Sequence, residues 1–456
     1  MLDRYRRIRA FSDLLATPLS AEDCTLQSME EASPIRWHLA HTTWFFETFV
    51  LREIGNYPQF SDVFERLFNS YYNAVGEQFP RAQRGLLSRP GQAEVLNYRA
   101  HVDAHIIKAL EAGSLCTEKL TVLEIGLHHE QQHQELMLTD IKHAFSINPL
   151  QPAYRASANL ASGSFVGKVD DPASCDGPVS QPSVSTSPEP TAKDTSRWID
   201  GPTGVVEIGN GDSGFAFDNE RPRHKVYVQP FQLACQCVTN GEYLQFIDAG
   251  GYEQPQWWLS MGWSFVQQRN LTAPLYWHKT KTGWEQFTLA GMQPVSLEEP
   301  VCHVSLFEAD AFARWAGCRL PTEAEWESCV ESRMTSPGQA SLTAVEGHWS
   351  DRLLNAGSAP QPQCGKGDLH LTDLENAFGN VWEWTASPYT CYPGFTTLAG
   401  ALGEYNGKFM CNQFVLRGGS CATPSGHVRS TYRNFFPPET RWQFSGIRLA
   451  RSPSDD

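Results

Sequence analysis

The sequence lacks the marks of a membrane protein, a secreted protein or a nucleic-acid-binding protein. No apolar run approaches the ~18–20 residues that cross a bilayer, and residues 1–9 contain no apolar core of a secretory signal. Basic residues are scarce, with 36 Lys and Arg against 51 Asp and Glu, so the formal net charge is −15. This charge disfavours nucleic acid or an anionic membrane as a partner. We therefore expect a cytoplasmic protein.

The regular spacing of a disulfide framework is also missing. The twelve cysteines are scattered along the chain, and the closest pair, Cys235 and Cys237, lies in an apolar, strand-like run. We expect reduced cysteines, several of them buried, because thiols behave as small apolar groups inside cytoplasmic proteins.

The chain does contain enough apolar residues for two globular domains. Of its 456 residues, 41% are hydrophobic and 19% are charged, and this length exceeds one ordinary core. We predict a helical domain at 1–155, a linker at 156–197 and a second domain at 198–456. The segment 170–196 is rich in Pro, Ser, Thr and Asp, which is typical of a flexible insertion.

Residues 1–150 predict helices with few turn signals. Ser33 and Pro34 predict an N-cap and a first helical residue. The aromatic-rich helix that follows is long enough for four to five turns and is expected to reach Leu51.

Two further helices are expected at 92–112 and 117–145. Helices of this length favour a four-helix bundle, whose core is a place where facing helices build metal sites. The segment 57–90 between the helices is predicted to be a long loop, and loops of this length are more often functional than idle.

From Trp198 onward the pattern indicates an α+β domain with much irregular chain. Short strand-like runs alternate with Gly, Pro and Asn turns at Gly204–Ile208, His224–Val228, Phe231–Cys235 and Phe414–Leu416. Two helices are predicted to interrupt the strands, at 240–249 with Thr239 as cap and at 306–316 with Ser305 as cap.

The segment His129-Glu130-Gln131-Gln132-His133 carries the main chemical signal of the chain. On a helix, His129 and His133 project from one face, one turn apart, and two imidazoles at this spacing can bind one divalent metal. Three interpretations are open: a polar helix face, a zinc hydrolase with Glu130 as general base, or a non-haem iron site with a third ligand elsewhere. Thr139 stands where a metzincin has its third histidine.

The third metal ligand is expected from another helix of the bundle. His38 and His41 are three residues apart and lie near one face, so geometry does not choose between them. His101 and His105, on the next helix, compete on spacing alone. The residues by themselves leave the third ligand open.

Several segments resemble a known family. Leu39–Thr42, His129–Glu135 and Asn148–Tyr154 resemble the DinB-like four-helix bundle of ergothioneine-biosynthesis sulfoxide synthases (EgtB type). The C-terminal half resembles the irregular α+β, C-type-lectin-like fold of formylglycine-generating enzymes, also called sulfatase-modifying factors. The matching segments there are Phe217–Glu220, Val238–Tyr243, Arg319–Glu327, Gly379–Thr385, Leu416–Ser420 and Phe444–Leu449.

The resemblance implies an iron(II) ion held by His41, His129 and His133, with O2 as co-substrate. The implied reaction is oxidative C–S coupling of hercynine, the trimethylated betaine of histidine, with cysteine or γ-glutamylcysteine to give a sulfoxide. Three imidazoles leave three positions open for thiolate, second substrate and O2, whereas a zinc hydrolase needs only one for water. His38 and His128 are then neighbours and not ligands.

The resemblance also implies contacts with hercynine. Gln132 and Asn434 match family residues that contact this substrate. Phe435 and Phe436 are expected to form part of an apolar wall for the trimethylammonium group, with ordinary inter-domain packing as the alternative. Members that prefer γ-glutamylcysteine carry Trp-Asp in place of this phenylalanine pair, so free cysteine is the expected donor.

Two pairs in the 57–90 segment complete the implied site. Tyr71 and Tyr72 resemble a tyrosine pair from which one subgroup draws its proton donor, and the sequence does not say which member donates. A surface aromatic pair is the alternative. Arg81 and Arg84 match residues that bind the carboxylate of the thiol substrate, which a guanidinium fork fits well. Generic solvated arginines are the alternative.

Other activities share this architecture. A selenosugar-dependent selenoneine synthase and an ovothiol-type sulfoxide synthase are the nearest alternatives, and a zinc hydrolase or a binding module with a structural metal is more distant. Formylglycine-generating enzymes use a copper-binding cysteine pair shortly after Gly-Gly-Ser. Here Ser420 is followed by Cys421 with no partner, so that chemistry is not expected.

Two questions remain open at this level. Relatives can bind calcium near the segment Asn380–Glu383, but the sequence does not establish such a site. The oligomeric state is also open, a homo-oligomer included. The expected partners are therefore small molecules: hercynine, a cysteine-type thiol and O2.

Overall fold

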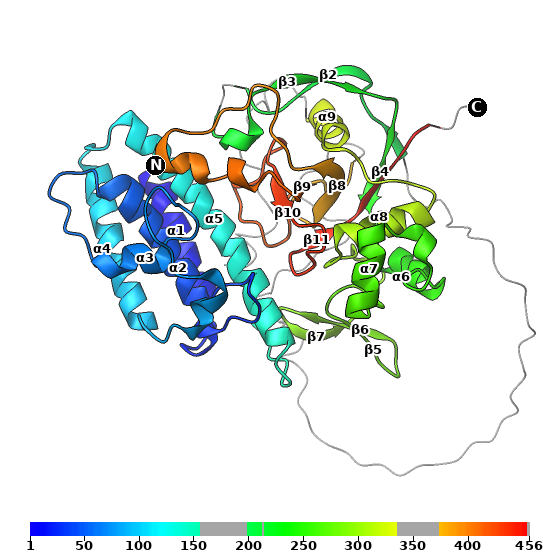
Figure 1. Ribbon diagram of the computed structural model, residues 1–456, viewed down its shortest axis with the longest axis horizontal. Helices are drawn as coiled ribbons and strands as arrows, with labels where there is room; N and C mark the ends of the chain where they lie inside the picture. Colours follow the sequence, from blue (N-terminus) through cyan, green and yellow to red (C-terminus); the bar gives the residue numbers. More distant parts are fainter. Residues whose placement is uncertain (156–197, 212–213, 335–373, 454–456) are drawn as a thin grey trace, which may run out of the picture.

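The computed structural model describes residues 1–155, 198–211, 214–334 and 374–453 (Figure 1). A helical domain and an α+β domain pack side by side, which confirms the predicted fold class. The predicted linker at 156–197 lies outside the described residues. Within the described part of the chain, no helix combines the length and the apolar character that crossing a membrane requires.

Long helices of the first domain form a bundle. They are α1 (Leu2–Ala16), α2 (Ile35–Phe46), α4 (Gln92–Glu111) and α5 (Thr117–Ser146). α2 packs against α4 and α5, and α1 packs against α5. The two helices that carry the candidate metal ligands therefore lie next to each other in the core of the bundle.

α2 begins differently from the prediction. Pro34, and not Ser33, occupies the N-cap position, and its carbonyl accepts the N–H of His38 at 3.1 Å. Ser33 instead donates its backbone N–H to Asp140 on α5, at 2.8 Å. The helix continues as a π-helical turn, Glu47–Leu51, to the predicted end.

The segment 57–90 is not a plain loop, which corrects the prediction. It contains the short helix α3 (Asp62–Phe68) and a 3-10 turn at Arg81–Leu86. Two phenylalanine rings of α3 pack on Tyr98 of α4, with centroids 5.1 and 6.4 Å apart. Burial of these rings anchors the segment to the bundle.

The second domain consists of short helices and small sheets. Its helices are α6 (Asn240–Asp248), α7 (Ser260–Arg269), α8 (Leu306–Trp315) and α9 (Glu323–Arg333). Its strands are β1 (Trp198–Asp200), β2 (Gly204–Ile208), β3 (His224–Val228), β4 (Gln232–Cys237), β5 (Trp277–Lys279), β6 (Trp284–Thr288), β7 (Gly291–Pro294), β8 (Trp382–Pro388), β9 (Phe414–Arg417), β10 (Asn434–Phe436), β11 (Ser445–Gly446) and β12 (Arg448–Arg451).

The strands form four sheets within the described residues. Their orders are β10–β9–β8–β11, β1–β4–β12, β5–β6–β7 and the hairpin β2–β3. β11 pairs with β8 in parallel, and the other strand pairs are antiparallel. The strand β10, which carries the predicted hercynine contacts, is held at the edge of its sheet by β9.

Local predictions hold well in this domain. β2 and β3 have the predicted bounds, and Thr239 and Ser305 cap α6 and α8. Each cap hydroxyl accepts an N–H three residues on, at 3.2 Å, and the glutamate there bonds back to the cap. Cys235 and Cys237 are buried on β4, as expected for packed thiols.

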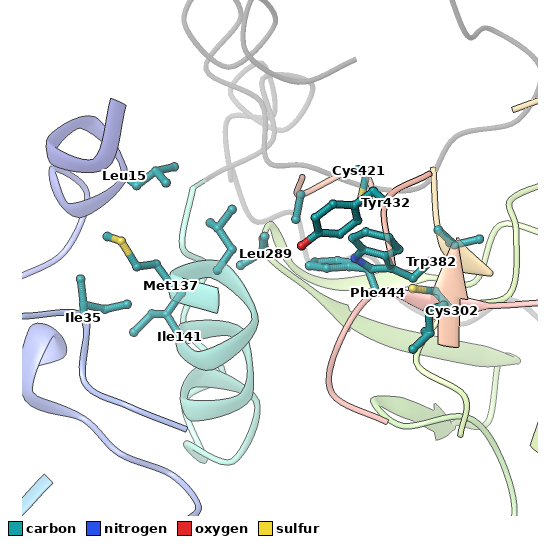
Figure 2. Close-up of a cluster of buried hydrophobic side chains, with 14 of the residues drawn as sticks. Leu15, Ile35, Met137, Ile141, Leu289, Cys302, Trp382, Cys421, Tyr432 and Phe444 are labelled. Atoms are coloured by element: carbon teal, nitrogen blue, oxygen red, sulfur yellow. The ribbon is translucent and has the colours of Figure 1, made fainter. Parts of the chain in front are cut away.

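One hydrophobic core runs through both domains (Figure 2). Met137 and Ile141 of α5 pack among the bundle residues of this cluster, which continues through Trp382 and Phe444 of the C-terminal domain. Polar contacts cross the same boundary. Gln131 donates to the carbonyl of Ser425 at 2.8 Å, and the Trp382 indole donates to Glu135 at 2.8 Å. α5 therefore lies at the interface between the two domains and contacts both.

Candidate metal centre

The structure brings three of the predicted histidines together. His41 comes from α2, His129 and His133 come from α5, and one nitrogen of each lies within 4.8 Å of the others. The Nε2 atoms of His41 and His129 are 3.1 Å apart. His41 and His129 are buried, whereas His133 is partly exposed. No other group of three His, Cys, Asp or Glu ligands in the described ranges converges in this way.

Hydrogen bonds behind two of the rings determine which nitrogen faces the centre. His41 Nδ1 donates to the carbonyl of Phe68 at 2.6 Å, which leaves Nε2 without a proton. His133 Nδ1 lies 2.7 Å from Nδ1 of His38. His129 Nδ1 is buried and has no hydrogen-bond partner among the described residues. Metal-ligating histidines commonly have such outer bonds, so the arrangement at His41 and His133 fits a metal.

Burial keeps the three imidazoles neutral. It lowers the pKa of His129 to about 3, although the adjacent Glu130 carboxylate opposes the shift. Burial, followed by the neighbouring His129, lowers the pKa of His41 and of His133 well below 6.5. The neutral imidazole is the form that binds a metal, and three nitrogen donors suit a divalent first-row transition ion. The residues present therefore fit such an ion.

Glu130 points away from this centre, into the bundle. Its carboxylate accepts bonds from Arg9 at 2.9 Å, from Arg99 at 3.2 Å and from the Ser12 hydroxyl at 2.6 Å. Burial alone would raise its pKa, but the two arginines outweigh burial and lower the pKa to about 2. A hydrolase of the His-Glu-x-x-His type needs this glutamate beside the metal-bound water. The geometry here does not support that interpretation.

A cavity of about 410 Å³ opens beside the histidines, and residues of both domains line it. His129 and His133 belong to its wall. All six predicted substrate-binding residues and one of the two predicted catalytic tyrosines lie in the same wall: Arg81, Arg84, Gln132, Asn434, Phe435, Phe436 and Tyr71. Tyr72 does not line the cavity and is fully buried behind it.

Gln132 is held in one orientation by two tyrosines. Its Nε2 donates to the hydroxyl of Tyr432 at 2.7 Å, and its Oε1 accepts a bond from the hydroxyl of Tyr405. Both tyrosines line the cavity, and the ring of Tyr405 lies edge-on to His129 at 5.7 Å. Sequence reasoning missed both. Tyr432 sits two residues before the noted Asn434, whereas Tyr405 lies in a segment that carried no signal.

Arg84 is a buried cation at the cavity wall. Its guanidinium lies 3.4 Å from the ring centroid of Trp37, which in turn stacks on His41 at 4.5 Å with only 12° between the planes. It donates to the hydroxyls of Ser33 and Ser70, at 2.9 and 3.1 Å. Burial lowers its pKa to about 8, and Arg81 adds to the shift. No carboxylate of the described residues bonds to it, so its charge is available to a ligand.

The predicted Tyr71–Tyr72 pair is stacked, with ring centroids 4.6 Å apart. Tyr71 faces the cavity and also contacts Phe409 edge-on at 5.1 Å. Burial raises the pKa of both phenols, so they stay protonated at neutral pH. Arg81, which also lines the cavity, is exposed and donates to the carbonyl of Glu31.

The residues of β10 form part of the cavity wall contributed by the C-terminal domain. Asn434 and Phe436 line the cavity, and Phe435 stacks on Tyr389 with centroids 4.0 Å apart and planes 10° apart. Gln443 lines the cavity as well, and neither atom of its buried amide has a partner among the described residues. It was not among the predicted site residues. The only indication of Gln443 in the sequence is that a polar residue stands between Trp442 and Phe444.

The predicted neighbour His128 and the competing pair His101 and His105 lie outside the three-histidine group. His128 stacks on Phe215 at 3.9 Å and lies 3.0 Å from His427, facing the C-terminal domain. On α4, His101 bonds to the carbonyl of Pro58 at 2.9 Å, and His105 bonds to the carbonyl of His101. Neither α4 histidine belongs to the cluster at the centre.

The segment noted for calcium in relatives is engaged in a buried ion pair. The carboxylate of Glu383 accepts bonds from Arg448 at 2.7 and 2.8 Å and from the indole of Trp326 at 2.6 Å. Cys421, the cysteine that follows the Gly-Gly-Ser segment, is buried, and burial raises its pKa well above 9. Glu383 and Cys421 therefore contribute to the packing of the C-terminal domain.

Comparison with known proteins agrees with this architecture. Residues 4–137 match the DinB superfamily, and residues 184–453 match the sulfatase-modifying factor enzyme 1-like domain. A hercynine oxygenase of Mycolicibacterium thermoresistibile is 32% identical over 92% of this chain and 87% of its own length. The hercynine oxygenases of Mycolicibacterium smegmatis and Mycobacterium tuberculosis are 31% and 33% identical over 92% of this chain and 91% of theirs. The chain therefore belongs to the hercynine oxygenase family.

Proposed function

We propose that this protein is an iron(II)- and O2-dependent sulfoxide synthase that joins hercynine to a cysteine-type thiol. The observation that carries the proposal is the three-histidine group beside a cavity lined by both domains, with His129 and His133 in the cavity wall. The relatives named hercynine oxygenase, which match nearly the whole chain, support an oxygenase.

The reaction balances without a further reductant. One C–H bond of the hercynine ring and the S–H bond of the thiol are broken, and a C–S bond forms. One oxygen atom of O2 becomes the sulfoxide oxygen, and the other leaves as water with the two hydrogens. Iron(II), when bound, supplies the activation of O2 that side chains cannot.

His41, His129 and His133 are the proposed ligands. As neutral nitrogen donors they would hold the ion from the bundle side and leave it accessible to substrates entering from the cavity. A zinc hydrolase would need one open position and a nearby carboxylate base. The ion pairs of Glu130 with Arg9 and Arg99 disfavour that alternative.

Hercynine is proposed to bind beside Gln132. The two tyrosine hydroxyls hold this amide in a fixed orientation before substrate arrives, which lowers the entropic cost of binding. Asn434 offers a second amide from β10. The aromatic wall at Phe435 and Phe436 suits the trimethylammonium group, because ring faces attract a poorly hydrated cation.

The thiol substrate is proposed to bind through its carboxylate at Arg84, with Arg81 at the rim. A buried guanidinium that bonds only to hydroxyls gains a counter-charge when a carboxylate arrives. Tyr71 is the proposed proton donor of the tyrosine pair, because it lines the cavity, whereas Tyr72 is fully buried and does not. Free cysteine remains the expected donor.

The deciding experiment is anaerobic loading with Fe(II), followed by hercynine, cysteine and O2, with products identified by mass spectrometry. We expect hercynylcysteine sulfoxide, and we expect the His129→Ala variant to form none. His101→Ala is the matched control, because this histidine lies on α4 and contacts the backbone of Pro58 instead of the centre. It should keep wild-type activity.

The thiol donor is tested in the same assay. γ-Glutamylcysteine and a selenosugar replace cysteine in parallel reactions, and the preferred donor is the one with the highest kcat/KM. If iron-loaded protein fails to consume O2 with each of the three donors, the proposed function is overturned.

A further inference from the structure

Behind His133, two more side chains continue away from the centre. His133 Nδ1 lies 2.7 Å from His38 Nδ1, and His38 Nε2 lies 3.0 Å from Asp140 Oδ2. His38 is 2% exposed and Asp140 is 6% exposed. The three residues therefore form a hydrogen-bonded chain from a proposed ligand on α5, through the buried His38 of α2, to a buried carboxylate two turns further along α5.

The hydrogen-bonding capacities of these groups give the chain a direction. A carboxylate only accepts, so His38 Nε2 carries the proton that lies between His38 and Asp140. A neutral His38 then has an unprotonated Nδ1, which accepts the proton of His133 Nδ1. This leaves Nε2 of His133 unprotonated, on the side of the ring that faces His41 and His129.

Asp140 also fixes the start of α2. The same Oδ2 atom accepts the backbone N–H of Ser33 at 2.8 Å, just before the N-cap at Pro34. The side chain of Ser33 in turn accepts a bond from Arg84 at 2.9 Å. One carboxylate thus connects α5, which carries two proposed ligands, with the first turn of α2, which leads to the third.

The three proposed ligands differ in the hydrogen bonds behind their imidazole rings. His41 has a backbone carbonyl behind it, and His129 Nδ1 has no partner among the described residues. Only the ring of His133 leads, through another side chain, to a carboxylate. The Asp140 carboxylate orients His38 strongly, because a charge-assisted bond is stronger than a neutral one, and His38 in turn accepts the bond from His133.

We propose that Asp140, acting through His38, is a positioning residue that sets the tautomer and ring orientation of His133, and so the affinity of the centre for a divalent metal. This inference rests on the proposed function in taking His133 as a ligand. Removal of such outer support weakens metal binding by about 10–100-fold in metalloproteins.

The test is anaerobic titration with Co(II), whose visible absorption bands report the coordination geometry. Asp140→Ala removes the bonds of the carboxylate to His38 and Ser33, together with a 3.4 Å bond from the Thr139 hydroxyl. His38→Phe interrupts the chain and leaves the bond between Asp140 and Ser33 in place. We expect the dissociation constant for Co(II) to rise about 10–100-fold in both variants, with shifted absorption bands. Asp140→Asn, which keeps an acceptor oxygen without the charge, should fall between wild type and Asp140→Ala.

Glu135→Gln is the matched control for metal binding. Glu135 is another buried carboxylate on α5, but its partners are Trp382, Ser420 and Thr423, and it contacts no proposed ligand. Its Co(II) affinity and spectrum should be those of wild type. Thermal unfolding of each variant shows whether it is folded before the titration.

Two results would overturn the inference. Wild-type Co(II) affinity and spectrum in folded His38→Phe and Asp140→Ala would show that the chain has no effect on His133. Loss of affinity in Asp140→Ala alone, with wild-type behaviour in His38→Phe, would show that Asp140 acts through Ser33 and not through His38. If wild-type protein itself binds neither Co(II) nor Fe(II), the proposed function fails, which is a separate outcome.

Discussion

Glu130 and Glu135 lie five residues apart on α5, both buried, and they meet opposite surroundings. Glu130 faces the bundle, where Arg9 and Arg99 supply two positive charges and lower its pKa to about 2. Glu135 faces the C-terminal domain, where its bonds come from an indole and two hydroxyls. Burial there raises its pKa, and the three donors only partly offset the shift.

The difference shows how one helix serves two purposes. On the bundle side, an ionised carboxylate is part of a buried ion network that fixes α1, α4 and α5 relative to each other. On the domain side, neutral donors hold a carboxyl group whose protonated form burial favours. The sequence of α5 does not tell these roles apart. The zinc-hydrolase alternative arose because Glu130 stands in a His-Glu-x-x-His pattern, although its side chain faces the arginines of the bundle.

Truncation of Glu130 is expected to have the largest effect on stability of the substitutions at these two glutamates. Glu130→Ala should lower the free energy of unfolding by about 3–5 kcal/mol, because two buried guanidinium groups lose their shared carboxylate. Urea unfolding followed by circular dichroism measures the change. Glu135→Ala, which leaves only neutral donors without a partner, should cost about 1–3 kcal/mol. Equal losses in the two variants would contradict the contrast.

Lowering the pH gives a second test, because the contributions of Glu130 and Glu135 to stability change with pH in opposite directions. The folded-state pKa of Glu130 is lowered, so its contribution is present above its unfolded value of 4.5 and is lost as pH falls from 4.5 toward 2. The lowering from 4.5 to about 2 corresponds to about 3 kcal/mol. Glu130→Gln should therefore flatten the acid limb of the stability profile, and an unchanged limb would assign the acid sensitivity to other groups.

The smallest effect is expected from Glu135→Gln. The raised folded-state pKa of Glu135 means that its ionised form opposes folding as pH rises above 4.5, and that protonation removes this cost. A neutral amide avoids ionisation, so stability at pH 7 should change by less than about 1 kcal/mol. The difference from wild type should shrink further as pH falls toward 4. Melting temperatures across this range measure it, and a large loss at pH 7 would refute the prediction.

Local sequence signals predicted much of the fold. Thr239 and Ser305 could be recognised as caps because a Thr or Ser side chain just before a helix accepts a backbone N–H of the first turn, which is a local interaction. Ser33 misled because its backbone N–H bonds to Asp140, more than 100 residues away. α3 was missed because its packing on Tyr98 depends on a helix that follows it in the chain.

The residues of the candidate centre also differ in whether the sequence could predict them. His129 and His133 could be paired from their spacing on one helix, whereas the choice of His41 over His38 came only from the family resemblance. Asp140 had an unused signal, since seven residues after His133 it lies near the same helix face. Tyr405 had none, because it reaches Gln132 across 273 residues from an irregular segment.

Trp37 lies between Arg84 and His41, with its ring face against the guanidinium at 3.4 Å and parallel to the imidazole at 4.5 Å. An indole in this place is an optical reporter, since a paramagnetic ion at His41 would quench its fluorescence and a carboxylate at Arg84 would shift its emission. The chain contains 14 tryptophans, so the difference between wild type and Trp37→Phe isolates the signal. The protein thus carries its own probe for the order in which metal and thiol substrate arrive.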